Sequence, residues 1–330
     1  MSNITLTDQF VCSINNLHTT SIILDDLSCI FIKGIDFKRY LQGQLTIDVF
    51  SLKINEHVMT AQCDVNGKVR SIIRLFFYDD GVMCIVRKSL VQQTLMTFKK
   101  YSLFSKVQIF LDDQIVLLGM IGLDIRIFLE KFFILLPNKD NIIIHIKNKI
   151  SILWFNVPTE RFLLLMPLSY AIDFQKKIKN LIHVYDRKYW KYLDIASGFP
   201  IFDKEIKSKF IPQSVNLDLF NGINYHKGCY IGQEIIAKIY FSQINYKKMY
   251  WLVGNINYIP VLGSILKVKN NDHFIYVGFI LSVVRISSDL IWIQAILKDK
   301  ISKESILYLN EDVNYPLYIN DSVFYGNFIK

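Results

Sequence analysis

Residues 34–41, GIDFKRYL, and residues 122–129, GLDIRIFL, decide the fold, because they are two copies of one pattern. Each copy begins with a glycine, an aliphatic residue and an aspartate, and ends with an aromatic residue followed by leucine. The two copies are offset by 88 residues. An aspartate ahead of spaced apolar residues is typical of a helix start. We therefore expect a short helix after Asp36, another after Asp124, and a repeated structural unit around them.

The elements around the first copy alternate between strands and short helices. Residues 24–33 read as a strand, and residues 57–64 and 68–77 read as a hairpin across Asn66-Gly67, a pair that favours a tight turn with positive φ. A second hairpin turns at residues 79–81. Ser89 then opens a helix, with Gln92 completing a capping box, and residues 106–111 form a last strand.

The same order recurs after the second copy. Strands are predicted at residues 116–119, 142–146, 150–155 and 161–166, a helix from Ser169 to about residue 180, and a closing strand at 181–185. We therefore predict two related α+β modules, each an antiparallel sheet with helices on one face.

The last part of the chain differs from the two modules. Residues 186–195 read as a helix, and residues 196–224 show little periodicity. Four strand candidates follow, at 250–253, 265–268, 274–284 and 290–296, and short strands with polar turns indicate a small barrel or sandwich. We expect three domains, at residues 1–112, 113–242 and 243–330.

Composition limits the classes of protein. The chain of 330 residues is 52% hydrophobic and 20% charged, which excludes a disordered protein. No apolar run approaches the roughly 18 residues that a membrane helix needs. The net charge of +9 favours an anionic partner such as RNA, a nucleotide or a polyglutamate tail. However, 50 Ile against 5 Ala and 30 Lys against 8 Arg equally fit a bacterium with A/T-biased codons.

The five cysteines are scattered, without a CxxC pair, so we predict neither a zinc site nor a disulfide framework. The N-terminus lacks a basic segment followed by an apolar run, which is the pattern of a signal peptide. A cytoplasmic protein, away from membranes and monomeric, is the expectation.

Residues 227–234, KGCYIGQE, carry the densest set of chemical groups. A helix that starts near Gly232 would place Cys229 just before its N-terminus, where the helix dipole and Lys227 favour a thiolate. The glycines let a backbone approach a ligand closely, while Gln233 and Glu234 suit the donor edge of a heterocycle. A turn with a buried structural cysteine is the alternative.

A resemblance to a known family rests on this segment and on others. Upstream of it stand FIPQ at 210–213, NL at 216–217 and GI at 222–223. Further matches are LDD at 24–26, YLQGQ at 40–44 with Asp48, CD at 63–64 with GK at 67–68, and residues 99–107. Together they resemble the folate-binding YgfZ proteins over nearly the whole chain.

The resemblance implies the fold of the glycine-cleavage T-protein, with α+β modules around a central opening and a C-terminal β-barrel. It implies binding of a tetrahydrofolate derivative and support of iron–sulfur enzymes, among them the tRNA methylthiotransferase. It thus implies a part in tRNA modification, with tRNA an indirect partner. A non-catalytic folate-binding factor without a metal is the expectation.

Site residues follow from the same resemblance. The motif residues are Lys227, Gly228, Cys229, Tyr230, Gly232, Gln233 and Glu234. Trp190 matches a folate-contacting tryptophan, although a core tryptophan on an amphipathic helix is the alternative. Close relatives commonly have a second tryptophan where this chain has Leu27. Leucine keeps apolar contact but loses ring stacking, worth on the order of 1 kcal/mol, so we expect weaker folate binding.

Two other functions remain open. A folate-dependent one-carbon transferase of the aminomethyl type needs a carboxylate near the folate nitrogens, and Asp64 and Asp48 are the candidates. A direct tRNA-binding protein fits the charge and the 14% of aromatic residues, although the lysines are spread along the chain.

Overall fold

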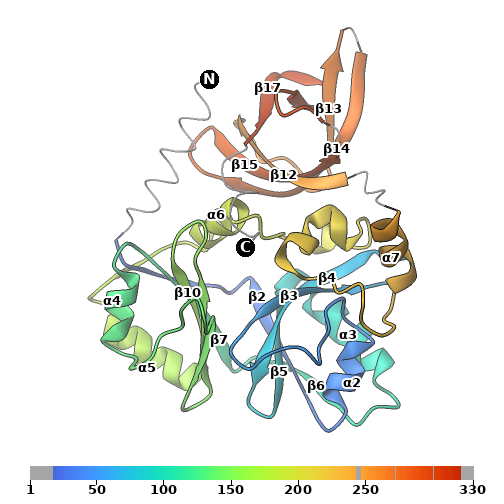
Figure 1. The fold of residues 1–330 in the computed structure, drawn as a ribbon. Coiled ribbons are helices and arrows are strands. Elements are labelled where there is room, and N and C mark those ends of the chain that lie inside the picture. Colours follow the sequence, from blue (N-terminus) through green and yellow to red (C-terminus); the bar gives the residue numbers. More distant parts are fainter. Residues whose placement is uncertain (1–17, 243–246, 272, 300, 321–330) are drawn as a thin grey trace.

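The computed structural model describes residues 18–242, 247–271, 273–299 and 301–320. They form two α+β modules that lie side by side and a β-barrel that lies across one end of both (Figure 1). The predicted α+β architecture with a C-terminal barrel is therefore confirmed. Across the described residues, no helix combines the length and the apolar character that crossing a bilayer requires.

The first module is a five-stranded antiparallel sheet in the order β3-β4-β5-β2-β6. Alternate residues of β2 face opposite sides: Ile30 and Ile32 pack under the helices, while Cys29 and Phe31 face the second module. The module consists of β2 (Leu27–Lys33), α2 (Phe37–Gln42), β3 (Val58–Cys63), β4 (Val69–Tyr78), β5 (Gly81–Arg87), the 3₁₀ turn η1 (Lys88–Leu90), α3 (Val91–Tyr101) and β6 (Gln108–Asp112).

The second module is a six-stranded sheet in the order β11-β1-β7-β10-β9-β8. The sequence led us to expect an antiparallel sheet throughout. Instead, the edge strand β11 runs parallel to β1. Strand β1 precedes the whole first module in the chain, yet pairs with β7 here. The elements are β1 (Thr20–Ile23), β7 (Ile115–Ile121), α4 (Ile125–Glu130), β8 (Ile143–Ile146), β9 (Ile150–Phe155), β10 (Arg161–Pro167), α5 (Leu168–Ile178) and β11 (His183–Val184).

The repeated glycine explains why the two copies of the pattern match. Gly34 and Gly122 have φ values of +120° and +134°, a region that disfavours side chains. A Cβ atom on Gly34 would lie 2.3 Å from the carbonyl oxygen of Lys106, and one on Gly122 would lie 2.6 Å from Thr19 Cα. In both modules a strand therefore turns into a helix against a neighbouring backbone, where only glycine fits.

Helices α2 and α4 begin directly after Asp36 and Asp124, as predicted. Neither Asp36 nor Asp124 caps its helix through the side chain; the Asp36 carboxylate instead accepts a hydrogen bond from the backbone N–H of Lys106 at 2.7 Å. Ser89 lies inside η1 rather than opening α3, and its hydroxyl donates to Asp203 at 2.6 Å. Long-range partners thus compete successfully for side chains that local patterns assign to caps.

The hairpin at Asn66-Gly67 is present, joining β3 to β4. Of the two residues only Gly67 has a positive φ, of +69°. The Asp64 carboxylate accepts backbone hydrogen bonds from Asn66 and Lys68, at 2.9 and 3.0 Å, and thereby closes the turn. The turn is therefore one residue longer than a two-residue loop, with the glycine in the left-handed position.

Between the modules and the barrel the chain forms helix α6 (Lys188–Ala196), then irregular backbone, then helix α7 (Gln233–Phe241). The irregular stretch contains only short 3₁₀ turns, which are η2 (Lys204–Ile206), η3 (Pro212–Val215) and η4 (Leu217–Phe220). The loss of periodicity predicted after residue 196 is confirmed.

The barrel closes in the strand order β12-β15-β14-β13-β16-β17. The sequence pattern located four of its strands and missed the last two: β16 is only four residues long, and the polar residues Asp312 and Asn314 interrupt the apolar pattern of β17. The strands are β12 (Lys247–Asn255), β13 (Ile265–Asn270), β14 (His273–Arg285), β15 (Leu290–Lys298), β16 (Ile306–Leu309) and β17 (Asp312–Ile319). Trp251 and Trp292 pack together in it at 4.5 Å between ring centroids.

Helix α6 joins the barrel to the two modules. The Lys191 ammonium donates to the carbonyl oxygen of Val283 at 2.8 Å, and the Tyr192 hydroxyl donates to that of Arg285 at 2.7 Å. The same helix places Trp190 and Leu193 in the core cluster that fills the space between the facing sheets. The position of α6 therefore fixes how the three bodies meet.

Candidate functional site

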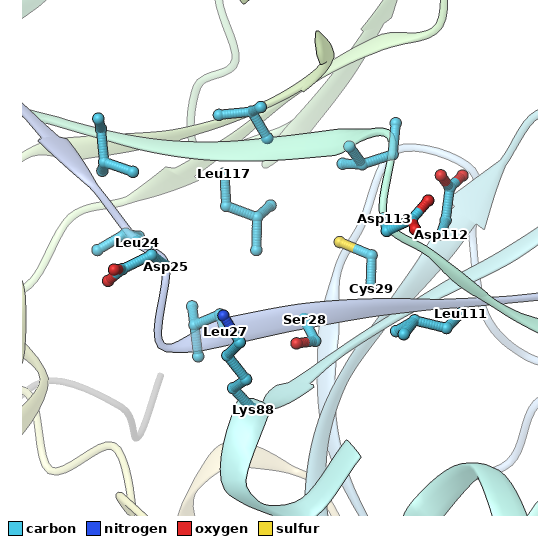
Figure 2. A pocket seen from close by; sticks show the side chains of 13 residues that line it. Leu24, Asp25, Leu27, Ser28, Cys29, Lys88, Leu111, Asp112, Asp113 and Leu117 are labelled. Atoms are coloured by element: carbon cyan, nitrogen blue, oxygen red, sulfur yellow. The ribbon is translucent and has the colours of Figure 1, made fainter. Parts of the chain in front are cut away.

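A cavity of about 290 Å³ lies where the two sheets face each other (Figure 2). Its walls come from the β1–β2 turn, the start of η1 and the β6–β7 turn. Figure 2 shows Cys29 and Leu117 extending from β2 and β7 into the space between these strands, with Asp112 and Asp113 at one end. Leu27 and Lys88 also line it. The cavity is thus mostly apolar, with charged groups at its edges.

A second, smaller cavity of about 90 Å³, which we call the inner cavity, also lies between the modules. Leu27 lines this cavity as well, so the two cavities share a wall at that residue. Trp190 of α6 lines the second cavity together with the charged side chains Arg74 and Asp194. The structure therefore brings Leu27 and Trp190, which lie 163 positions apart in the sequence, to the walls of one cavity system.

Trp190 is held in a tightly packed environment and is only 5% exposed. The guanidinium of Arg161 lies 4.4 Å from its ring centroid, and Phe155 meets it edge-on at 5.8 Å. Behind it, a Cβ atom on Gly119 would lie 2.6 Å from the indole, so the glycine in β7 makes room for the ring. Trp190 is thus a core residue that also forms part of the cavity wall.

Charged groups gather at this inner end of the cavity system. Arg161 is fully buried, and its guanidinium donates to the Asp194 carboxylate at 2.9 Å. Arg74 donates to His57 Nδ1 at 3.0 Å, and His57 Nε2 lies 3.1 Å from the carbonyl oxygen of Trp154. Burial, and then the charge of Arg74, lower the pKa of His57 to about 3, so this imidazole is neutral at physiological pH.

The motif 227–234 lies elsewhere, against the first module, and none of its residues lines either central cavity. Lys227 donates to the carbonyl oxygens of Gln42, Leu45 and Ile47 at 2.6, 2.8 and 2.5 Å. We had expected the Lys227 ammonium to favour a thiolate at Cys229; instead, three backbone carbonyl oxygens accept its hydrogen bonds. Its ammonium fixes the motif to the loop after α2.

The glycines of the motif also serve packing. Gly232 has a φ of +84°, and a Cβ atom there would lie 2.5 Å from the Asp64 carbonyl oxygen. The loop thus packs directly onto the β3–β4 turn. Gln233 donates back to the carbonyl oxygen of Lys227 at 3.2 Å, and Glu234 lies exposed in the first turn of α7. We had expected these two side chains to face a heterocycle; instead one closes the loop.

Cys229 is placed as the sequence predicted, four residues before the start of α7 and ahead of its N-terminus. Within the described part of the chain it is the one exposed cysteine, whereas Cys29, Cys63 and Cys84 are buried. Burial raises the pKa of these three thiols, which keeps them protonated. The described residues contain no group of three or more His, Cys, Asp or Glu placed to hold a metal.

The two carboxylates considered for one-carbon transfer are engaged in turns. Asp64 closes the β3–β4 turn, and Asp48 accepts from Gln42 at 3.0 Å and from the backbone of Phe50 at 3.1 Å. Neither lines the cavities beside Trp190. Sequence reasoning missed Arg74 and Asp194, which both line the cavity beside Trp190. A signal was present for Arg74, a charge inside the apolar run SIIRLFF of residues 71–77.

The overall fold identifies the structural class of the protein. The crystal structure of the glycine cleavage system aminomethyltransferase T from Bartonella henselae matches with a TM-score of 0.78. The match covers 96% of this chain and 88% of that protein, at 13% sequence identity. At that identity the likeness shows the fold alone, which is the aminomethyltransferase T fold.

Sequence comparison then gives the family. The family model for the YgfZ β-barrel domain matches residues 245–312. The tRNA-modifying protein YgfZ of Buchnera aphidicola subsp. Acyrthosiphon pisum is 38% identical over 306 residues, which cover 93% of this chain and 96% of that protein. Its counterpart in Yersinia enterocolitica is 35% identical over 305 residues, covering 92% of each. This chain belongs to the YgfZ family.

Proposed function

We propose that this protein is a folate-binding accessory factor in tRNA modification, which holds a tetrahydrofolate derivative between its two α+β modules and supports iron–sulfur enzymes such as the tRNA methylthiotransferase. Membership of a family whose members are called tRNA-modifying proteins supports the tRNA part. The likeness of the fold to an aminomethyltransferase supports the folate part.

The observation that carries the proposal is the cavity system shared by Leu27 and Trp190. Apolar and aromatic walls with a few polar groups are typical of small-molecule sites. The larger cavity also contains Lys88, a cation suited to the glutamate carboxylates of a folate. A bound reduced folate supplies a carrier for one-carbon units. The residues of this chain would bind it, orient it and exclude water.

A noncatalytic role fits the carboxylates better than a transferase role does. Asp48 and Asp64 are engaged by backbone and amide groups of their own turns, away from Trp190. If purified protein released formaldehyde or formed methylene-tetrahydrofolate, the transferase role would have to replace the accessory one.

Cys229 supplies the contact with an iron–sulfur client in this proposal. Its thiol is exposed beside Gly228, which has open space around it. A single cysteine cannot hold a cluster, since clusters usually take four protein ligands, so a client protein must provide the others. We expect Cys229→Ser to lower tRNA methylthiolation in a strain that lacks its own family member. Full restoration at equal protein level would remove the thiol from the mechanism.

Calorimetric titration with reduced folates tests the folate part. The wild type should bind 5-formyl-tetrahydrofolate, and Trp190→Leu should bind it at least tenfold more weakly. Trp154→Phe is the matched control, because Trp154 is a tryptophan on strand β9 of the second module that lines neither central cavity. Absence of binding by the wild type, or equal binding by Trp190→Leu, would contradict the proposal.

A further inference from the structure

Arg74, Arg87 and Asp194 are the charged residues that line the inner cavity. Arg74 and Arg161 approach it from opposite modules, and Asp194 is the carboxylate between them. Among the described residues no carboxylate forms an ion pair with Arg74. His57 is neutral, so within this described part of the chain Arg74 has no ion-pair partner of its own, whereas Arg161 pairs with Asp194 and Arg87 pairs with Asp26 and Asp203. A buried charge without a partner is costly, so such a group points to a ligand.

Aromatic rings hold the two guanidinium groups in place. The Arg74 guanidinium carbon lies 4.7 Å from the Phe155 ring centroid and 5.0 Å from that of Phe199. Arg161 lies 5.1 and 5.7 Å from the same two centroids. Arg161 is fully buried, and its Nε atom has no hydrogen-bond partner. The cluster is therefore a rigid, built feature with unused donors.

Arg74 and Asp194 differ from Arg161 in one respect: both line the cavity itself. Arg74 uses Nη1 for His57, which leaves its Nε and Nη2 donors without a hydrogen bond to described residues. Asp194 uses Oδ1 for Arg161, which leaves Oδ2 as an acceptor. The wall therefore presents a donor and an acceptor together, which is complementary to an amide-like edge with one carbonyl oxygen and one N–H.

We propose that Arg74 and Asp194 read the lactam edge of the folate heterocycle, with Arg74 donating to the 4-oxo oxygen and Asp194 accepting from the N3–H and 2-amino groups. This inference rests on the proposed folate function. Trp190 and Leu27 then supply the apolar walls on either side of the heterocycle, and Arg161 acts through Asp194 as a positioning residue.

Folic acid and aminopterin test this, because in aminopterin an amino group replaces the 4-oxo group and N3 no longer carries a hydrogen. An amino group at that position would present a donor to Arg74, and a site built to hydrogen-bond its ligand discriminates strongly against a mismatched one. We expect the wild type to bind folic acid about tenfold or more tightly than aminopterin in calorimetric titrations. Arg74→Met should lower this preference at least threefold without abolishing it, because folic acid still donates its N3–H to Asp194 and aminopterin cannot. Arg74→Lys should give an intermediate value.

Arg70→Met is the matched control, because Arg70 lies on the same strand but does not line the cavity. It should keep the wild-type preference, and thermal melting should show that each variant folds. An unchanged preference in both Arg74 variants would overturn the assignment while leaving folate binding intact. Failure of the wild type to bind any folate would overturn both. Inorganic phosphate that competes through Arg74, without a 4-oxo preference, would assign a simple anion site and contradict the proposal.

Discussion

The cavity beside Trp190 and the motif loop at residues 227–234 are built in opposite ways. The cavity takes its wall from residues scattered over both modules, most of them on helices and strands and the rest in the irregular segment 199–202. The motif is one continuous stretch, held by backbone contacts and by Lys227. Sequence patterns therefore find the motif easily, yet most of its residues serve packing. The residues that can recognise a ligand are far apart in the sequence and share no common pattern.

The two glycines of the motif give the sharpest test of its packing role, with the largest expected effect. Gly232→Ala puts a side chain at a positive φ and 2.5 Å from a backbone oxygen, and should lower the free energy of unfolding by about 3 kcal/mol. Gly228→Ala, where nothing lies within 4 Å, should change it by less than about 0.5 kcal/mol. Equal effects in urea unfolding would show that the loop does not pack as described.

Lys227 tests the same role through its charge. Lys227→Met leaves three carbonyl acceptors without their donor, so we expect a loss of about 2 kcal/mol in the free energy of unfolding. Lys238→Met, on the exposed face of α7, is the control and should be nearly neutral. If Lys227→Met were as stable as the wild type and lost only thiol reactivity, the ammonium would act on Cys229 instead.

His57 tests the charge of the inner cavity through pH. Its pKa of about 3 in the folded protein lies below the ordinary value of 6.5. Between these values the unfolded chain binds a proton that the folded chain does not, so stability falls as pH drops. From pH 7 to 5.5 the wild type should lose about 1 kcal/mol more than His57→Gln, measured by urea unfolding at each pH. Parallel losses would mean that His57 is charged when folded.

Leu27 offers a gain of function, with the smallest expected effect. Leu27→Trp places a ring at the wall shared by the two cavities, and stacking on the heterocycle should add about 1 kcal/mol, or roughly fivefold in affinity for 5-formyl-tetrahydrofolate. Titration calorimetry measures it. Ile23→Trp is the comparison and should gain less, because Ile23 lines the larger cavity but not the inner one. A loss of affinity in Leu27→Trp would show that the ligand does not pass this residue.

Much of the fold could be predicted from the sequence. Hydrophobic periodicity located the hairpins, the helices after Gly34 and Gly122, and four of the barrel strands. It could not place β1 in the second module, since that pairing joins strands almost a hundred residues apart. Capping patterns also predicted that the side chains of Ser89 and Asp36 cap helices, because the true hydrogen-bond partners of these side chains, Asp203 and the backbone of Lys106, lie far along the chain.

The candidate site was predicted only in part, because here too distant parts of the chain come together. Trp190 and Leu27 entered through the family resemblance and Cys229 through its position ahead of a predicted helix, and the structure gives each a defined environment. Arg74 and Asp194 could not be grouped from the sequence, because their meeting depends on how β4 and α6 pack against each other.

A crystal structure with bound 5-formyl-tetrahydrofolate tests most directly whether the space between the modules is the ligand site. We predict density for the heterocycle beside Trp190, within hydrogen-bonding distance of Arg74 and Asp194, and for the glutamate tail toward Lys88. Density at the motif loop near Cys229, with the central cavities empty, would contradict this.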